Sequence, residues 1–145
     1  MNTNQISSPN AGKAGFSTEE EISLAKALGC ARAAIDKKAE NLKVLDLSEL
    51  SAFTDYFVIC SGTSDRQVKA IADSVEKAME SVGYNALSTE GYTDGRWVLI
   101  DFGDVVVHVF LDALREYYDL ETLWADAPKI SIPSEFYGVA ASRLN

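Results

Sequence analysis

Apolar residues that alternate along the chain predict a β-hairpin at residues 97–110, around which the other elements are organised. Residues 98–102 and 105–110 are rich in β-branched and aromatic side chains, and Gly103-Asp104 between them is typical of a two-residue turn. This turn pairs Phe102 with Val105, Ile100 with Val107, and Val98 with Val109. Because strand side chains alternate with period two, these six residues form one wholly apolar face, which we expect in the core.

The opposite face of this hairpin is mixed. It places Asp101 beside Val106, Leu99 beside His108, and Trp97 beside Phe110. Large apolar side chains therefore lie next to a carboxylate and the only histidine of the chain. Such a face suits either a second packed layer or a binding surface, and the pattern leaves both open.

Helical spacing of apolar residues predicts a first helix after residue 17. The run Ser-Thr-Glu-Glu at 17–20 predicts a capping box, with Ser17 as the cap and Glu20 reaching back to it. Lys37 and Lys38 suit the last turn, where they oppose the helix dipole. Alanines at positions 25, 27, 31, 33 and 34 favour close packing of this helix. The apolar stripe is expected at Leu24, Leu28, Ala31 and Ile35.

A second helix follows residue 64. Ser64 and Gln67 predict another capping box, and Gly83 supplies a left-handed stop. Its apolar stripe is expected at Val68, Ile71, Ala72, Val75, Ala78, Met79 and Val82.

Short strands are predicted at residues 43–47 and 86–88, and short helices at 111–118 and 120–124. The continuous apolar run at 55–60 is typical of a strand buried on both faces. The segment 48–54 reads as a loop with Leu50 and Phe53 tucked beneath it. This order predicts a single-domain α/β fold, with a mixed β-sheet and helices mainly on one side.

Three regions divide the chain. Residues 1–16 lack periodicity and are expected to form a mobile tail. Residues 17–127 form the folded domain, and residues 128–145 form a C-terminal tail. The apolar residues of that tail indicate that it docks on the domain; they are Ile130, Ile132, Phe136 and Tyr137.

Composition narrows the possible partners. The 145 residues are 47% hydrophobic and 24% charged, with a net charge of −9, so direct nucleic-acid contact is disfavoured as the main activity. The acidity is compatible with a basic protein partner or with solubility alone. Apolar runs fall short of the roughly 20 residues that span a bilayer. The N-terminus resembles neither a secretory signal nor a transit peptide, which favours a cytoplasmic protein.

Few residues suggest catalysis. Cys30 and Cys60 are expected to be reduced core residues, and no cluster has metal-ligand spacing, so neither a metal nor a cofactor is predicted. The Ser-Gly-Thr-Ser-Asp turn at 61–65 could hold a phosphate, although a plain capped turn explains it better. A nucleotidyltransferase would need a Gly-Ser pair and Asp-x-Asp, and both are missing. We therefore expect a protein that is not an enzyme.

Four side chains have two interpretations each. His108 could act as a general base, but a hydrogen-bonded surface or interface residue is the better reading. Tyr117, Tyr118 and Trp124 could equally be core residues or the aromatic anchors of an interface.

Several segments resemble one family. They are TDYFVICSGTSDRQVKAIAD at 54–73, EG at 90–91, WVLIDFGDVVVHVF at 97–110 and YYDLETLW at 117–124. Together they are similar to the ribosomal silencing factors, the Iojap-like family, over residues 17–126. The resemblance implies a nucleotidyltransferase-like fold without the catalytic residues. It also implies binding to the large ribosomal subunit through its fourteenth protein, which blocks small-subunit joining and represses translation when nutrients are limiting.

Two further expectations come from this resemblance. Organellar relatives assist ribosome biogenesis, so a biogenesis factor that uses the same contact is the first alternative. A nucleotide-binding nucleotidyltransferase that uses the turn at 61–65 is the second, and a homodimer is possible when the protein is free. Together with the mixed hairpin face, the resemblance predicts a partner-binding surface. Its residues are Trp97, Asp101, His108, Glu116, Tyr117, Tyr118, Asp119, Glu121 and Trp124.

Overall fold

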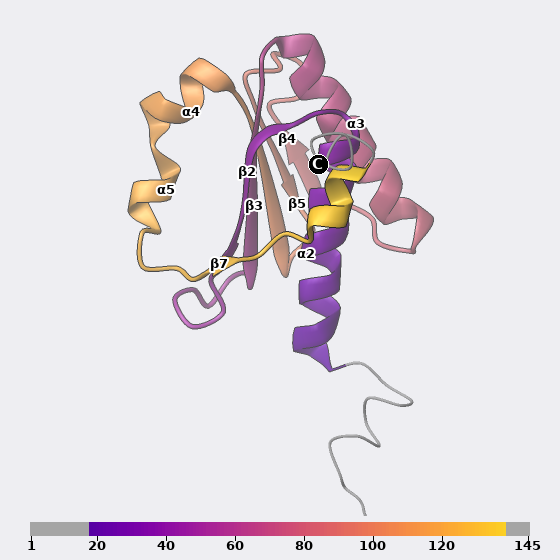
Figure 1. Ribbon diagram of the computed structural model, residues 1–145, viewed down its shortest axis with the longest axis vertical. Coiled ribbons are helices and arrows are strands. Elements are labelled where there is room, and N and C mark those ends of the chain that lie inside the picture. Colours follow the sequence, from indigo (N-terminus) through magenta and orange to yellow (C-terminus); the bar gives the residue numbers. More distant parts are fainter. Residues whose placement is uncertain (1–17, 139–145) are drawn as a thin grey trace, which may run out of the picture.

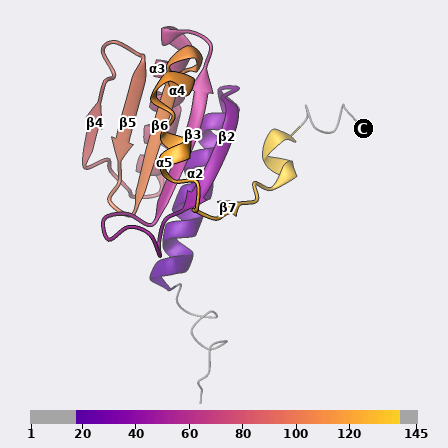
Figure 2. The same ribbon diagram turned by 90° about the vertical axis from the view of Figure 1, so that its left-hand side faces the viewer.

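The computed structural model describes residues 18–138, and its centre is a six-stranded sheet with helices on both faces (Figures 1 and 2). The strand order is β4-β5-β6-β3-β2-β7, in which β3 and β6 run parallel and the other described pairs run antiparallel. The strands are β2 (Glu40–Asp46), β3 (Tyr56–Gly62), β4 (Ser88–Glu90), β5 (Trp97–Asp101), β6 (Val105–Leu111) and β7 (Lys129–Ile130). The predicted mixed sheet is confirmed. The expected tail at 1–16 lies outside the described residues.

Helices of different length cover the two faces. The long helices α2 (Glu19–Asp36) and α3 (Asp65–Ser81) lie side by side on one face (Figure 1). The short helices α4 (Asp112–Tyr118) and α5 (Leu120–Leu123) lie on the other, across β3 and β6 (Figure 2). The helices are thus mainly on one side, and the second face carries a thin layer whose edges reach solvent.

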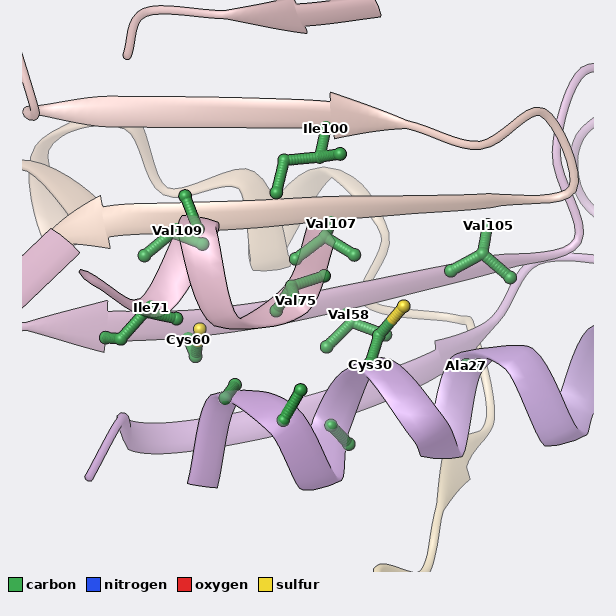
Figure 3. Close-up of a cluster of buried hydrophobic side chains, with 14 of the residues drawn as sticks. Ala27, Cys30, Val58, Cys60, Ile71, Val75, Ile100, Val105, Val107 and Val109 are labelled. Carbon is green, nitrogen blue, oxygen red and sulfur yellow. The ribbon is translucent and has the colours of Figure 1, made fainter. Parts of the chain in front are cut away.

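The hairpin has the predicted register. Ile100 pairs with Val107, Trp97 pairs with Phe110, and the Phe102 N–H donates to the Val105 carbonyl at 2.9 Å. The face with Ile100 and Val107 packs beneath α2 and α3, where both residues are fully buried (Figure 3). Burying an aliphatic side chain of this size stabilises a fold by roughly 1.5–3 kcal/mol, so this face anchors the sheet to the helices.

The buried face of α2 differs from the predicted stripe. Leu24, Leu28 and Ile35 are half-buried at its margins, and of the predicted four only Ala31 is fully buried. The small side chains allow α2 to lie close to both the sheet and α3, which leaves no room for leucines in between. The residues of this buried face are Ser23, Ala27, Cys30, Ala31, Ala33 and Ala34. Figure 3 shows Ala27 and Cys30 among the buried side chains.

The first capping box lies one residue later than predicted. Thr18, not Ser17, caps α2: its Oγ1 accepts from the Glu21 N–H at 3.1 Å, and Glu21 Oε1 accepts from the Thr18 N–H at 2.9 Å. The run of hydroxyl and acidic residues offers the same motif in two registers, and the structure has the second. The helix ends at Asp36, so Lys37 and Lys38 follow its last turn.

At the start of α3 only half of the predicted capping box forms. Ser64 Oγ accepts from the Gln67 N–H at 3.1 Å, as expected. The Gln67 side chain instead accepts from the Thr63 N–H at 2.7 Å and donates to the carbonyls of Lys37 and Lys38. The amide group therefore joins α3 to the end of α2 rather than closing the box.

Two predicted apolar positions are solvent-exposed. Leu50 and Phe53, expected beneath the loop, are 46% and 93% exposed. Leu47 is fully buried at this end of the sheet, and its carbonyl accepts from the Leu50 and Ser51 N–H groups. This turn directs the following side chains outward. Val82 is likewise 61% exposed, because it lies at the C-cap, after the end of α3.

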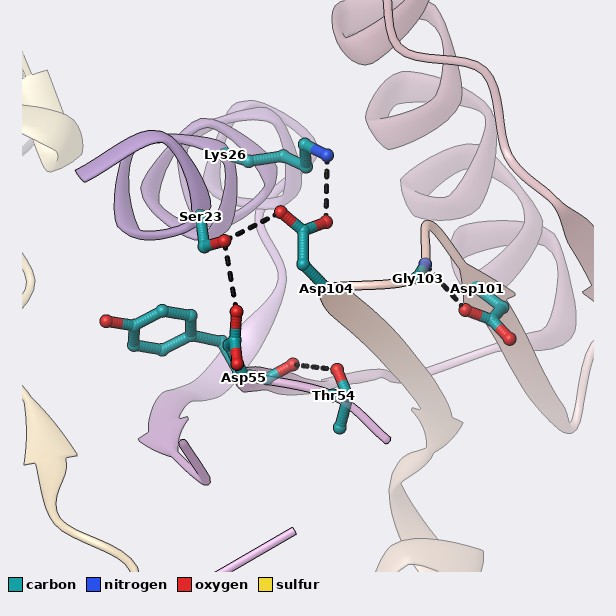
Figure 4. Close-up of polar contacts among 8 residues, drawn as sticks. Ser23, Lys26, Thr54, Asp55, Asp101, Gly103 and Asp104 are labelled. Carbon is teal, nitrogen blue, oxygen red and sulfur yellow. Dashed lines mark hydrogen bonds and ion pairs between the residues drawn. The ribbon is translucent and has the colours of Figure 1, made fainter. Parts of the chain in front are cut away.

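A polar cluster joins the hairpin turn to α2 (Figure 4). Asp104 accepts from Ser23 Oγ at 2.7 Å and from Lys26 Nζ at 2.8 Å, and Ser23 also contacts Asp55 at 3.2 Å. Burial opposes ionisation of Asp104, but the bonds from Lys26 and Ser23 outweigh it and hold the pKa below its ordinary value. Asp101 instead accepts from the Gly103 N–H, so the two aspartates do not converge on one point.

The segment after residue 128 docks on the domain, as its apolar residues predict. β7 adds an antiparallel edge strand to β2, and Ile130 and Ile132 pack against the core. The Phe136 ring, in the 3₁₀ helix η1 (Ser134–Tyr137), lies 5.5 Å from the Arg32 guanidinium of α2.

Candidate partner-binding surface

The second face of the sheet carries an aromatic stack centred on Trp97. The indole lies 4.8 Å from the Phe110 ring at 26° and 4.8 Å from the Tyr118 ring at 44°. Phe110 is fully buried, Trp97 is half-buried and Tyr118 is 51% exposed. The stack therefore runs from the sheet through α4 to solvent, and Trp97 links its buried and exposed ends.

His108 lies beneath this stack. It is 3% exposed, and its Nδ1 accepts from the Trp97 Nε1–H at 3.2 Å. Burial lowers the pKa of the imidazole to about 4. The structure thus places His108 in a hydrogen bond, as predicted, but below the surface rather than on it. No carboxylate, hydroxyl or thiol in the described chain is bonded to it as a general base would require.

The short helices α4 and α5 carry large side chains that are exposed to solvent. Tyr117 is 79% exposed and Leu123 is 74% exposed, and the Tyr117 ring meets Tyr118 edge-on at 5.2 Å. Trp124 differs, because it is half-buried with its ring 5.8 Å from Phe57. The sequence did not distinguish a core position from an interface position for Tyr117, Tyr118 and Trp124. The structure exposes the two tyrosines and packs Trp124 over the sheet.

Arg115 fastens α4 to the sheet, which the sequence did not predict. This residue is 8% exposed, and it donates from Nη1 to Ser61 Oγ at 2.9 Å and from Nε to Glu121 Oε1 at 2.8 Å. Glu121 also accepts from Lys43 at 2.6 Å. The bond from Arg115 is the main cause that lowers the pKa of Glu121 to about 2. Glu121, predicted to meet a partner, is therefore held in internal ion pairs.

Exposed carboxylates lie on the same short helices. Glu116 and Asp119 are exposed, and with Asp112 they border a hollow of about 330 Å³ that Lys43 and Arg115 also line. We name Trp97, Tyr117, Tyr118, Leu123, Glu116 and Asp119 the aromatic–acidic surface. A second hollow, of about 380 Å³, lies between Trp97, Tyr118 and Leu114. The shape offers a recess for a side chain beside exposed rings, and the charge favours a basic partner.

Asp101 is another predicted site residue that lies outside this surface, as do His108, Glu121 and Trp124. It shares a sheet face with Trp97 but lies four residues along β5, roughly 13 Å away at the usual strand rise. Its carboxylate accepts from the Gly103 N–H at 2.7 Å, which stabilises the hairpin turn. Asp101 is thus outside the aromatic–acidic surface.

Polar groups of the turn at 61–65 have hydrogen-bond partners within the chain. Ser61 binds Arg115, and the Thr63 and Gln67 N–H groups bond to side chains of the same turn. These contacts favour the capped-turn interpretation over a phosphate site. Across residues 18–138, no group of three or more His, Cys, Asp or Glu is arranged to hold a metal ion. None of the helices in this range has the length and apolar character of a membrane span.

Comparison with known proteins decides the family. A family model described as "Ribosomal silencing factor during starvation" matches residues 19–143. The chain belongs to the ribosomal silencing factor family. The match extends beyond residue 126, where the resemblance was expected to end, and includes the docked segment after Pro128.

Individual known proteins are similar to this chain in sequence and in structure. The chain is 49% identical over 98 residues to ribosomal silencing factor RsfS of Bacillus subtilis, covering 68% of this chain and 83% of that protein. It is 34% identical over 91 residues to the mouse protein named "Mitochondrial assembly of ribosomal large subunit protein 1". That match covers 61% of this chain and 40% of the mouse protein. A crystal structure of a Chromobacterium violaceum protein superposes with a TM-score of 0.70 at 39% identity, over 75% of this chain and 90% of that one.

Proposed function

We propose that this chain binds the large ribosomal subunit through the subunit's fourteenth protein and so blocks joining of the small subunit. It thereby represses translation in a bacterial cytoplasm when nutrients are limiting, and it acts by steric exclusion rather than by catalysis. The match of the silencing-factor model to residues 19–143 is the observation that carries this proposal.

The aromatic–acidic surface supports a protein partner. Tyr117 and Leu123 expose apolar area on helices that pack on the sheet, so little ordering entropy is lost when a partner covers them. Aromatic anchors beside a recess are typical of interface hot spots. Ribosomal proteins are basic, so Glu116 and Asp119 would orient such a partner and speed its association.

Co-sedimentation with purified large subunits, followed by a subunit-joining assay, tests this function. We expect the full chain to sediment with large subunits and to reduce the yield of joined ribosomes. Failure of the wild-type chain to sediment with large subunits would overturn the proposal. Binding without any effect on joining would overturn the steric mechanism.

Tyr117→Ala identifies the surface. Because Tyr117 is 79% exposed, its removal leaves the core intact, and we expect binding to weaken by about tenfold or more. Phe53→Ala is the matched control, since Phe53 is an aromatic residue 93% exposed on the β2–β3 loop. Equal binding by both variants would remove Tyr117 from the contact.

A large-subunit biogenesis factor is the second candidate. The name of the mouse mitochondrial relative, which describes assembly of the large ribosomal subunit, favours it. Such a factor would use the same contact, so the binding assay would not distinguish the two. Deletion of the gene does: immature large subunits during growth indicate biogenesis, whereas excess translation during starvation indicates silencing.

A homodimer of the free chain could form on the mixed face of the sheet or on a sheet edge, and on the mixed face it would use the same exposed rings. In that case the dimer and the ribosome-bound state compete, because one surface cannot serve both. Light scattering of the free chain, with and without the isolated ribosomal protein, tests the competition. A dimer that persists in the complex would exclude it.

A further inference from the structure

His108 combines deep burial with an incomplete set of hydrogen bonds. Within residues 18–138, its Nε2 is the buried side-chain nitrogen or oxygen atom that has no hydrogen-bond partner. An unpaired buried polar group is costly, and native proteins keep few of them. An apolar side chain could fill the same space between Phe57 and Phe110 without this cost. The imidazole must therefore supply something that an apolar residue lacks.

The hydrogen bond to Trp97 explains which nitrogen carries the proton. An indole N–H can only donate, so His108 Nδ1 must act as the acceptor across the 3.2 Å contact. In a neutral imidazole the proton then belongs to Nε2, which is buried and has no acceptor. The unpaired Nε2–H follows from using Nδ1 as an acceptor for one indole.

We propose that His108 is a positioning residue of the partner-binding surface, which fixes the indole of Trp97 and, through it, the placement of Tyr118. The hydrogen bond holds one edge of the indole, while the ring centroids of Phe110 and Tyr118 each lie 4.8 Å from that of the indole. Tyr118 is 51% exposed, so the orientation set below the surface is transmitted to solvent. This inference rests on the proposed function, since it assumes that the aromatic–acidic surface binds a ribosomal partner.

Burial also maintains this acceptor at neutral pH. It lowers the pKa of His108 to about 4, so the imidazole stays uncharged and Nδ1 keeps its lone pair. An imidazolium would carry protons on both nitrogens and could not accept from Trp97.

Two substitutions at position 108 separate positioning from packing. His108→Leu keeps the apolar volume but removes the acceptor, whereas His108→Asn places a carbonyl oxygen near the position of Nδ1. Hydrogen exchange of the Trp97 indole N–H, assigned by nuclear magnetic resonance with the help of Trp124→Phe, reports the bond directly. We expect exchange to be about tenfold faster or more in H108L, with most of the protection regained in H108N.

Affinity for large subunits supplies the second measurement. We expect H108L to bind about tenfold more weakly than the wild type and H108N to recover most of the loss. Trp97→Phe keeps the aromatic stack but lacks the N–H, so adding H108L to W97F should change affinity less than about twofold. Wild-type affinity in H108L, or an equal loss on both backgrounds, would overturn the proposal.

The two measurements also separate this inference from the proposed function. If the wild-type chain does not bind large subunits, the proposed function fails. Indole exchange then tests the positioning role by itself, and an unchanged exchange rate in H108L would refute that role as well. Should H108L fail to fold, W97F tests the same hydrogen bond from the other side. Binding by W97F at wild-type strength would then refute it.

Discussion

Arg115 on α4 donates from Nη1 to Ser61 Oγ at the end of β3, across 2.9 Å, and both residues are buried. This contact joins the helix that exposes Tyr117 and Tyr118 to the strand at the centre of the sheet. Since α4 has seven residues, it is too short to be stable alone, and its position depends on such tertiary contacts.

Removal of this guanidinium should loosen α4 and α5. Arg115→Met removes the hydrogen bonds that the guanidinium donates to Ser61 and Glu121. Lys43 still pairs with Glu121, so we expect a moderate loss, of about 2–3 kcal/mol in unfolding free energy. Urea unfolding measures the loss, and hydrogen exchange should rise within α4 and α5. Ser61→Ala, which removes one uncharged acceptor, should cost about 1 kcal/mol. Equal stability of R115M and the wild type would contradict this role.

Gly91 is expected to tolerate no side chain. Its φ is +80°, and an added Cβ would lie 2.0 Å from the Trp97 carbonyl oxygen. Gly91→Ala must therefore displace the start of β5, and we expect a loss of about 3 kcal/mol or more in urea unfolding. Gly83 provides the control, because its φ is +92° but nothing lies within 4 Å of an added Cβ. Gly83→Ala should cost about 1–2 kcal/mol, and equal losses would refute the steric argument.

Stability should decrease as the pH falls below 6.5. Burial lowers the pKa of His108 from its ordinary 6.5 to about 4, so between these values the unfolded chain binds a proton that the folded chain rejects. The contribution of His108 to the unfolding free energy, about 3 kcal/mol, is fully present above pH 6.5 and is lost as the pH falls to 4. Urea unfolding at intervals from pH 7 to 4 measures it. H108L should lack this component, and parallel curves for the two proteins would count against it.

A second acid-sensitive group titrates at lower pH. The bond from Arg115 holds the pKa of Glu121 at about 2, below its ordinary 4.5. The stabilisation is present above pH 4.5 and is lost as the pH falls towards 2. Glu121→Gln should remove this second decrease while leaving the one between pH 6.5 and 4 unchanged, which unfolding of both variants can show.

Both thiols should be unreactive in the folded chain. Cys30 and Cys60 are fully buried, and burial is the main cause that raises the pKa of each to about 12. Because the thiolate is the reactive form, we expect a thiol reagent at pH 8 to label the two cysteines no faster than the chain opens. The urea-unfolded chain should label both rapidly. Fast labelling without denaturant would show that this core opens.

Local pattern determined the hairpin register and the buried strand β3, whereas the strand predicted at 86–88 lies at Ser88–Glu90 and β7 was not predicted. Glycine followed by aspartate between two β-branched runs specifies a tight turn, and a slip of one residue would turn Ile100 and Val107 out of the core. This strong penalty explains why the observed pairing of Trp97 with Phe110 follows from sequence alone. The buried strand β3 was predictable for a similar reason, since a continuous apolar run has no exposed face.

Tertiary structure decided which face of α2 is buried and what each polar residue contacts. Helical spacing allows more than one stripe, and close packing against two neighbours chose alanines and Cys30 over Leu24 and Leu28. Likewise, nothing near Arg115 in the sequence points to Ser61, 54 residues away. His108 follows the same rule: alternation placed it on the mixed face, but only the helices that lie over that face buried it beneath Trp97. Short-range spacing specifies local geometry, whereas contacts between distant segments exist only once the chain has packed.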